Sequence, residues 1–170
     1  HTLIMKALEN TDARINIGKP VNPAFLFSVM LWQPMNDLRE HYLKNGASPF
    51  DAERLAADTV ISRQIATVAI PRRLTTMIRE IWALQSRLLQ RQGKRPFALL
   101  ANKRFRAAYD FLLLRSQAGE VETELADWWT EFQDANDDRR EAMQSQLPTD
   151  PGRKRKRRPR RRKPRSKASD

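Results

Sequence analysis

Several residue types on which catalysis and metal binding commonly depend are scarce in this chain. There is no cysteine, which excludes disulfide frameworks and thiolate chemistry and is consistent with a reducing compartment. The two histidines, His1 and His41, stand alone, and no serine has a histidine and an acid at credible spacing. Only five glycines occur, and none forms a phosphate-binding loop. We therefore expect no catalytic residue, metal site or cofactor site within this chain.

Long hydrophobic runs are also missing. The nearest candidate for a membrane span, residues 24–32, is far shorter than the ~20 apolar residues that a bilayer requires. We predict no transmembrane segment and, because no secretory signal pattern opens the chain, a cytoplasmic location. The chain begins at His1 inside an apolar helical pattern, so we expect it to be a piece of a longer protein.

Charge is present in excess but is unevenly distributed. The 170 residues carry 32 basic and 20 acidic side chains, a formal net charge of +12. Residues 151–170 hold 12 of the basic residues and one of the acidic ones, a net charge of +11. The sequence therefore predicts a nearly neutral folded body followed by a cationic tail.

Apolar spacing predicts an all-α fold, an irregular multi-helix body, whose central element lies between Pro71 and Gly93. Proline suits the first position of a helix, and glycine suits the position just past a helix end. The apolar residues between them recur with a period near 3.6, and arginines occupy the opposite surface. The apolar set is Leu74, Met77, Ile78, Ile81, Leu84 and Leu88, and the arginines are Arg72, Arg73, Arg79, Arg87 and Arg91.

Start and stop signals predict further helices on either side of the central one. Pro34 must break or kink the apolar helix that Asn22 and Pro23 open. The helix beginning at Ser48 is expected to bury an apolar set: Phe50, Leu55, Ala56, Thr59, Ile61 or Val60, and Ile65. In order, we predict helices at 2–12, 23–44 with the interruption, 49–66, 71–92, 97–100, 103–113 and 121–132, with a connector at 14–20.

These patterns divide the chain into four parts. We predict the end of a preceding helical segment with a connector at 1–20 and a helical body at 21–135. A polar connector follows at 136–147. Prolines among clustered charges then predict a disordered, Arg- and Lys-rich tail at 148–170.

The tail carries the strongest functional signal. Such a segment engages phosphates by releasing counterions, with affinity that is largely independent of sequence. Arginine also stacks on exposed bases, which favours single-stranded RNA. A nuclear localisation signal and adsorption to anionic lipid are rival interpretations. The candidate tail contacts are Arg153, Lys154, Arg155, Lys156, Arg157, Arg158, Arg160, Arg161, Arg162, Lys163 and Arg165.

A second basic group extends this candidate site onto the helical body. Its residues bracket the end of one predicted helix and the start of the next: Arg87, Arg91, Lys94, Arg95, Lys103, Arg104 and Arg106. Nearby aromatic residues are either core or stacking platforms for bases, and helical spacing more often indicates core. These are Trp82, Phe105, Tyr109, Trp128 and Trp129.

An ordered set of short stretches resembles the C-terminal half of bacterial poly(A) polymerases. These enzymes belong to the nucleotidyltransferase superfamily, which also includes tRNA CCA-adding enzymes. The matching stretches are NTD at 10–12, VNPAFLF at 21–27, IPRRLTT at 70–76, RQGKR at 91–95, KRFRAAYD at 103–110, LR at 114–115 and WWTEFQ at 128–133. The arginine-rich terminus fits this family as well.

The resemblance implies an all-helical RNA-binding region joined to an N-terminal catalytic head. In the family the head binds ATP and Mg²⁺ and adds AMP to RNA 3′ ends without a template. Its signature residues are not in this chain, so the resemblance implies that this chain alone is inactive. The implied partners are single-stranded RNA 3′ ends, the head itself and RNA-decay proteins. The RNA-holding role is carried over to Arg72, Arg73, Arg91, Lys94, Arg95, Lys103, Arg104 and the tail.

Two other functions remain open from the sequence. The helical body is alternatively a non-catalytic protein-interaction module with a basic tail that adds solubility. Within the same superfamily, the substrate is alternatively tRNA, as in CCA addition, and preference for a folded acceptor stem would indicate that case.

Overall fold

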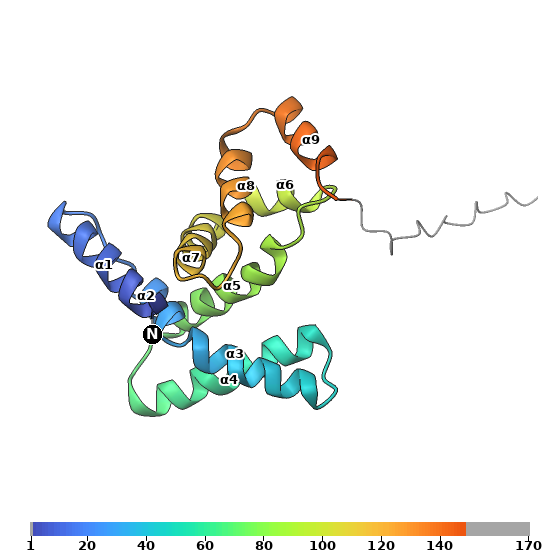
Figure 1. Ribbon diagram of the computed structural model, residues 1–170. Helices are drawn as coiled ribbons and strands as arrows, with labels where there is room; N and C mark the ends of the chain where they lie inside the picture. Colours follow the sequence, from blue (N-terminus) through green and yellow to red (C-terminus); the bar gives the residue numbers. More distant parts are fainter. Residues whose placement is uncertain (1, 149–170) are drawn as a thin grey trace, which may run out of the picture.

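The computed structural model describes residues 2–148, and within that range the chain is all-helical (Figure 1). The predicted disorder of 148–170 falls, apart from Pro148, outside the described residues. The helices are α1 (Thr2–Asn16), α2 (Pro23–Met30), α3 (Trp32–Lys44), α4 (Pro49–Thr67), α5 (Arg72–Leu88), α6 (Arg95–Leu100), α7 (Phe105–Gln117), α8 (Thr123–Asp134) and α9 (Asp137–Ser145).

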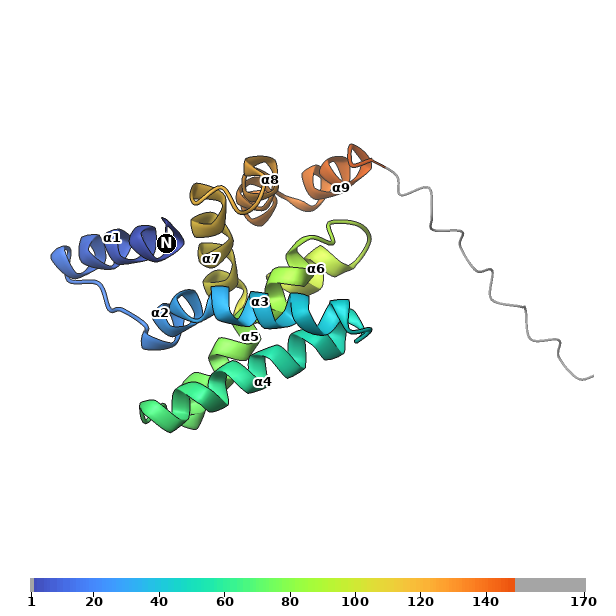
Figure 2. The same cartoon turned by 60° about the horizontal axis from the view of Figure 1, so that its bottom comes forward.

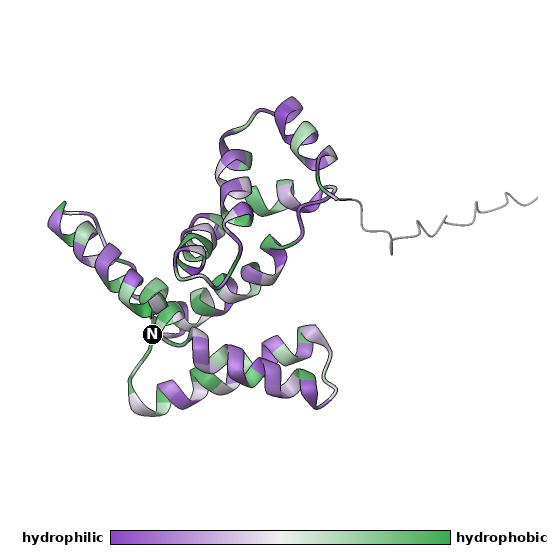
Figure 3. Cartoon of the chain, in the orientation of Figure 1, coloured by the Kyte–Doolittle hydropathy of each residue, from purple (hydrophilic) through white to green (hydrophobic). Residues whose placement is uncertain are grey.

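The central helix α5 runs through two hydrophobic cores. Its first half places Ile78, Ile81 and Trp82 in a core shared with α1 to α4 and α7. Its second half places Leu84 and Leu88 in a core shared with α6 to α9. The apolar face predicted for this helix is confirmed by its buried residues, and Figure 3 shows apolar and polar residues alternating along the helices.

The end of α5 differs from the prediction. The helix stops at Leu88, and Gly93 lies in the following connection with φ of +68°. The Leu88 carbonyl accepts a 2.8 Å hydrogen bond from the buried indole N–H of Trp129, and Gln90 N–H turns back to the Arg87 carbonyl. The last carbonyls of a helix need hydrogen-bond partners outside it. Because these contacts provide such partners at Arg87 and Leu88, the helix can end before Gly93.

The break between α2 and α3 lies N-terminal to Pro34, the residue that causes it. Sequence analysis placed the interruption at Pro34, but the helix changes direction at Leu31 and Pro34 lies in the first turn of α3. A helical proline ring clashes with the carbonyl four residues earlier, so the chain must deviate before the proline. The predicted N-cap at Asn22 is confirmed by its side-chain oxygen, which accepts from Ala24 N–H at 3.0 Å.

Helices α3 and α4 form an antiparallel hairpin that is visible in both orientations (Figures 1 and 2). The prediction that α4 buries Phe50 and Ile65 is wrong, because these residues are 74% and 46% exposed. The predicted burial of Ala56, Val60 and Ile61 is confirmed, and Ala52 and Ala57 complete the buried face of α4. Alanines let two helices approach closely, and the larger apolar side chains are left outside the contact.

The two ends of the described chain also differ from the predicted segments. Helix α1 continues to Asn16, through residues predicted as connector. Within 136–147, predicted as a polar connector, the structure places helix α9, which Asn136 caps through its side-chain oxygen. Met143 of α9 is buried in the second core. The four-part division itself stays a prediction.

Candidate nucleic-acid interface

The connection between α5 and α6 is held firmly against α8 and α9. Arg91 forms a 2.6 Å ion pair with Glu124, and its guanidinium lies 5.5 Å from the ring centre of Trp128. Gln144 of α9 donates to the carbonyls of Arg91 and Gly93 at 3.0 and 2.9 Å. Arg91 is therefore engaged within the protein, and its RNA-holding role stays a prediction.

The neighbouring cations remain accessible. Arg87, Lys94 and Arg95 are exposed, and within residues 2–148 none of the three forms an ion pair. Pro148, the last described residue, accepts a 2.9 Å hydrogen bond from the Gln92 side chain. The described chain therefore ends beside this connection, and the arginine-rich residues that follow in the sequence lie outside the described range.

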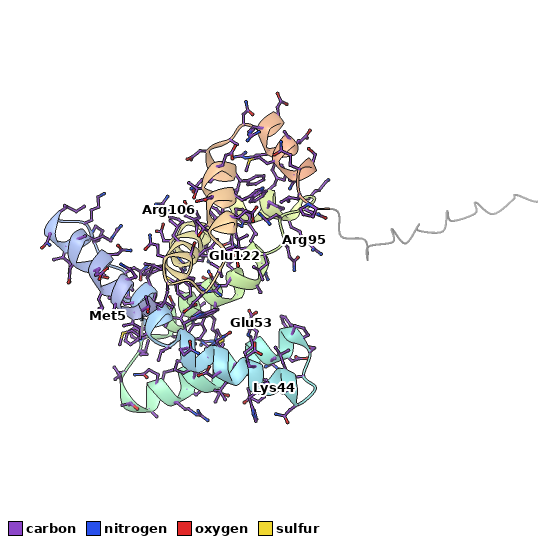
Figure 4. The ribbon with its side chains drawn as sticks, in the orientation of Figure 1. Met5, Lys44, Glu53, Arg95, Arg106 and Glu122 are labelled. Carbon is purple, nitrogen blue, oxygen red and sulfur yellow. The ribbon has the colours of Figure 1, made fainter. Side chains whose placement is uncertain are left out.

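Lys103 and Arg104 continue the basic surface at the α6–α7 connection. Both pair with Glu80 of α5, at 3.7 and 2.6 Å, but the Lys103 side chain remains 73% exposed. Arg106 at the start of α7 is equally exposed, pairs with Asp110 at 3.1 Å and lies over the ring of Tyr109. Figure 4 labels Arg95 and Arg106, with Arg106 on the side nearer α1.

Three hollows join these cations into one surface. Arg87, Arg95 and Asn102 line a hollow of about 260 Å³, and Arg87, Asn102 and Lys103 line a neighbouring one of about 220 Å³. Lys103 also lines a groove of about 570 Å³ between α1, α2, α5 and α7. Because each hollow shares a lining residue with the next, the cations form a continuous basic path, defined as Arg95, Arg87, Lys103, Arg104 and Arg106.

Arg72 and Arg73 are not part of this path. They lie exposed at the start of α5, and a helix rises ~1.5 Å per residue, so they are roughly 20 Å along its axis from Arg87. Their RNA-holding role stays a prediction. The candidate contacts from Arg153 to Arg165 lie outside the described residues.

The aromatic residues that were considered as base-stacking platforms are core residues. Trp82, Phe105, Tyr109, Trp128 and Trp129 are each less than 9% exposed. Trp82 donates its indole N–H to the Ser28 carbonyl at 2.9 Å, and Phe105 and Trp129 pack together with ring centres 5.6 Å apart. These rings are therefore not exposed as stacking platforms.

Sequence reasoning missed Arg14, which lines the α1–α7 side of the large groove. Its guanidinium donates to the Pro20 carbonyl at 3.1 and 3.4 Å. Residues 14–20 were predicted as a connector, so no local signal placed Arg14 on a helix facing α7. Only the tertiary packing of α1 brings it near Lys103 and Arg106.

Between residues 2 and 148, no group of three or more histidine, aspartate or glutamate side chains is arranged to hold a metal ion. No helix in the same range is long and apolar enough to cross a membrane.

Comparison with known proteins defines the class to which this architecture belongs. A family model for the polymerase A arginine-rich C-terminus matches residues 45–163, most of the chain and all of the basic path. The chain belongs to this family and represents the C-terminal region of a poly(A) polymerase.

The individual relatives that match the chain are also poly(A) polymerases. The chain is 44% identical over 168 residues to poly(A) polymerase I of Salmonella typhi and 42% identical to that of Escherichia coli O157:H7. It is 42% identical over 166 residues to poly(A) polymerase I of Haemophilus influenzae. The alignments cover 95–96% of this chain but only 36% of each relative, so the chain spans about a third of their length.

Proposed function

We propose that this chain is the RNA-holding portion of a poly(A) polymerase. Joined to an N-terminal catalytic head, it would keep single-stranded RNA 3′ ends close while the head adds AMP from ATP without a template. The observation that carries the proposal is the junction at Pro148 and Gln92, where the arginine-rich segment leaves the body beside Lys94 and Arg95. A strand bound by that segment can pass directly onto the basic path.

The physical reason for such an arrangement is local concentration. A polymerase that extends the same strand repeatedly benefits from a tether that ignores sequence, because the 3′ end then returns to the active site more often than it escapes. Arginine and lysine contacts to phosphates provide this tolerance, since every nucleotide presents the same backbone. The path therefore needs accessible cations in a row rather than a base-specific pocket along its whole length.

The chemistry itself is assigned to the head. We propose that ATP and Mg²⁺ bind there, that the chain works in the cytoplasm in RNA processing and decay, and that RNA-decay proteins are its partners. The polypeptide described here contributes binding and positioning. It should therefore incorporate no AMP when assayed alone.

Charge reversal at the junction tests the proposal. In the full chain, Lys94→Glu with Arg95→Glu should weaken binding of a fluorescent 20-nucleotide single-stranded RNA by about tenfold, because two phosphate contacts become repulsive. The matched control is Lys44→Glu with Arg63→Glu, an equal change of charge at exposed positions on the α3–α4 hairpin, where Figure 4 labels Lys44. The control should weaken binding less than about threefold, through net charge alone. Fluorescence anisotropy measures both.

Two outcomes would contradict the proposal. Equal losses in the two double variants would mean that net charge, and not the basic path, governs binding. Failure of the unmodified chain to bind RNA at all would favour the protein-interaction alternative. Competition by a folded tRNA acceptor stem, stronger than by unstructured RNA of equal length, would point to the CCA-adding alternative.

A further inference from the structure

The groove between α1, α2, α5 and α7 lies at one end of the basic path and has a different character from the path. Its floor is apolar, formed by Ala7, Phe25, Met77 and Leu114 from four different helices. Its volume of about 570 Å³ is in the range of small-molecule sites and exceeds what the path hollows offer. We call this hollow the α1–α7 groove.

The charged side chains that line the groove favour a negatively charged ligand. Four cations border it, Arg14, Lys103, Arg104 and Arg106, against one lining carboxylate, Asp110. Arg106 is paired with Asp110, while Lys103 and Arg104 pair with Glu80, which lies outside the groove. The net positive rim suits a ligand with an anionic part, and the apolar floor suits a ligand with a flat, weakly polar part.

A nucleotide has both parts. We propose that the α1–α7 groove binds one nucleotide of the RNA strand, with the base against Phe25 and Met77 and its phosphate at Lys103. This inference rests on the proposed function, because it takes the strand to run along the basic path. It goes further by assigning a base-binding site to a surface on which α1 and α7 face each other.

The polar groups inside the groove give the site a preference among bases. The Asp110 carboxylate can accept a hydrogen bond from an exocyclic amino group, which adenine has and uracil lacks. The side chains of Asn22 and Gln117 also line the groove. The Asn22 oxygen is engaged by Ala24 N–H, and its amide nitrogen contacts only the Met77 sulfur at 3.4 Å, a weak interaction that a ligand can replace. The groove should therefore favour adenosine over uridine.

Titration of the full chain with mononucleotides tests the site independently of RNA affinity. Adenosine 5′-monophosphate should shift the NMR signals of the Asn22 and Gln117 side-chain amides, and uridine 5′-monophosphate should need about tenfold higher concentration. Ribose 5-phosphate, which has no base, should leave these amide signals in place. Ala13→Trp, at an exposed position of α1 that lines the groove, should block the response. Ala66→Trp, at an exposed position of α4, is the matched control and should leave the response intact.

Different results would contradict the nucleotide site in the groove and the proposed RNA-holding function. If adenosine 5′-monophosphate leaves the groove signals unchanged, or shifts them equally in the Ala13→Trp variant, the nucleotide site is wrong even where Lys94→Glu with Arg95→Glu still weakens RNA binding. If the unmodified chain does not bind the 20-nucleotide RNA, the proposed function fails, whatever the mononucleotide does. A response to ribose 5-phosphate equal to that of adenosine 5′-monophosphate would also overturn the base site, because phosphate alone would then account for it.

Discussion

At the scale of single residues, Asp110 is the carboxylate whose protonation the fold changes most directly at the candidate site. Burial raises its pKa above the ordinary value of 3.8, and the nearby Arg106 and Arg14 guanidinium groups offset part of that rise. The folded state therefore holds the Asp110 proton more tightly than the unfolded state. The carboxylate is charged at neutral pH only at some cost to stability, a cost that a bound amino group would reduce.

The sign of the resulting pH dependence follows from linkage. Between pH 3.8 and the raised pKa, the folded state binds more protons than the unfolded state, so the Asp110 contribution to stability falls as pH rises. Asp110→Asn cannot titrate and should lose this component. In urea unfolding across mildly acidic pH, the wild type should lose stability relative to the variant as pH rises through this window. A difference that is flat, or of opposite slope, would show that burial does not control this carboxylate.

Residue roles at the site were predictable only where they depend on neighbours in sequence. Lys94 and Arg95 lie together because they are adjacent in the chain, and the prediction that they form one exposed basic group needs no tertiary information. Arg91 was given the same role, yet it is largely engaged by Glu124, a partner 33 residues away. Arg14 was missed for the opposite reason, since its place in the groove depends on how α1 packs against α7.

At the scale of helices, a partly buried cluster ties α3, α5 and α7 together. Arg115 of α7 donates to Gln85 of α5 at 3.2 Å and to Glu120 at 3.2 Å, and its guanidinium lies 4.6 Å from the ring centre of Trp32 of α3. Gln85 in turn donates to the Ala108 carbonyl at 3.0 Å. One side chain therefore provides hydrogen bonds and aromatic contact to two other helices at a single point.

Removing Arg115 should be costly because the buried side-chain oxygen of Gln85 loses its hydrogen-bond donor. Arg115→Ala should lower the free energy of unfolding by about 2–3 kcal/mol, since breaking a buried charged network removes more than a surface ion pair does. Arg63→Ala, at an exposed position on α4, is the control and should change stability by less than about 0.5 kcal/mol. Urea unfolding followed by circular dichroism measures both. A loss below about 1 kcal/mol for Arg115→Ala would mean that the cluster is solvated in practice.

The helices themselves were more predictable than their ends and orientations. Periodicity identified the apolar face of α5, and the Ser48 and Asn22 caps were readable because capping is local. The end of α5 at Leu88 could not be predicted from local sequence, because the Trp129 indole that donates to the Leu88 carbonyl comes from another helix. In α4 the burial of Ala56 and Ile61 was predicted, but Phe50 and Ile65 were wrongly added to the buried face, because apolar residues surround this helix and only tertiary packing selects the side that is buried.

At the scale of the whole molecule, α5 and α7 join two hydrophobic cores, and the basic path runs over the second core toward the first. The α5–α6 connection is fixed by α8 and α9 through Arg91 and Gln144, so the cations next to it are presented from a supported surface. The last described residue, Pro148, contacts Gln92 on that surface. Body and tail are therefore expected to bind one strand together.

The measurement that tests this expectation most directly is the salt dependence of single-stranded RNA binding. It compares residues 1–170 with residues 1–148, each with and without Lys94→Glu and Arg95→Glu. We predict a steep slope for the full chain and a shallower slope with weaker binding for 1–148. The double variant should reduce the slope by roughly 1.4 in both lengths, since each lost phosphate contact on a single strand contributes ~0.7. No binding by 1–148, or no effect of the double variant in the full chain, would contradict the account by showing that the tail acts without the body.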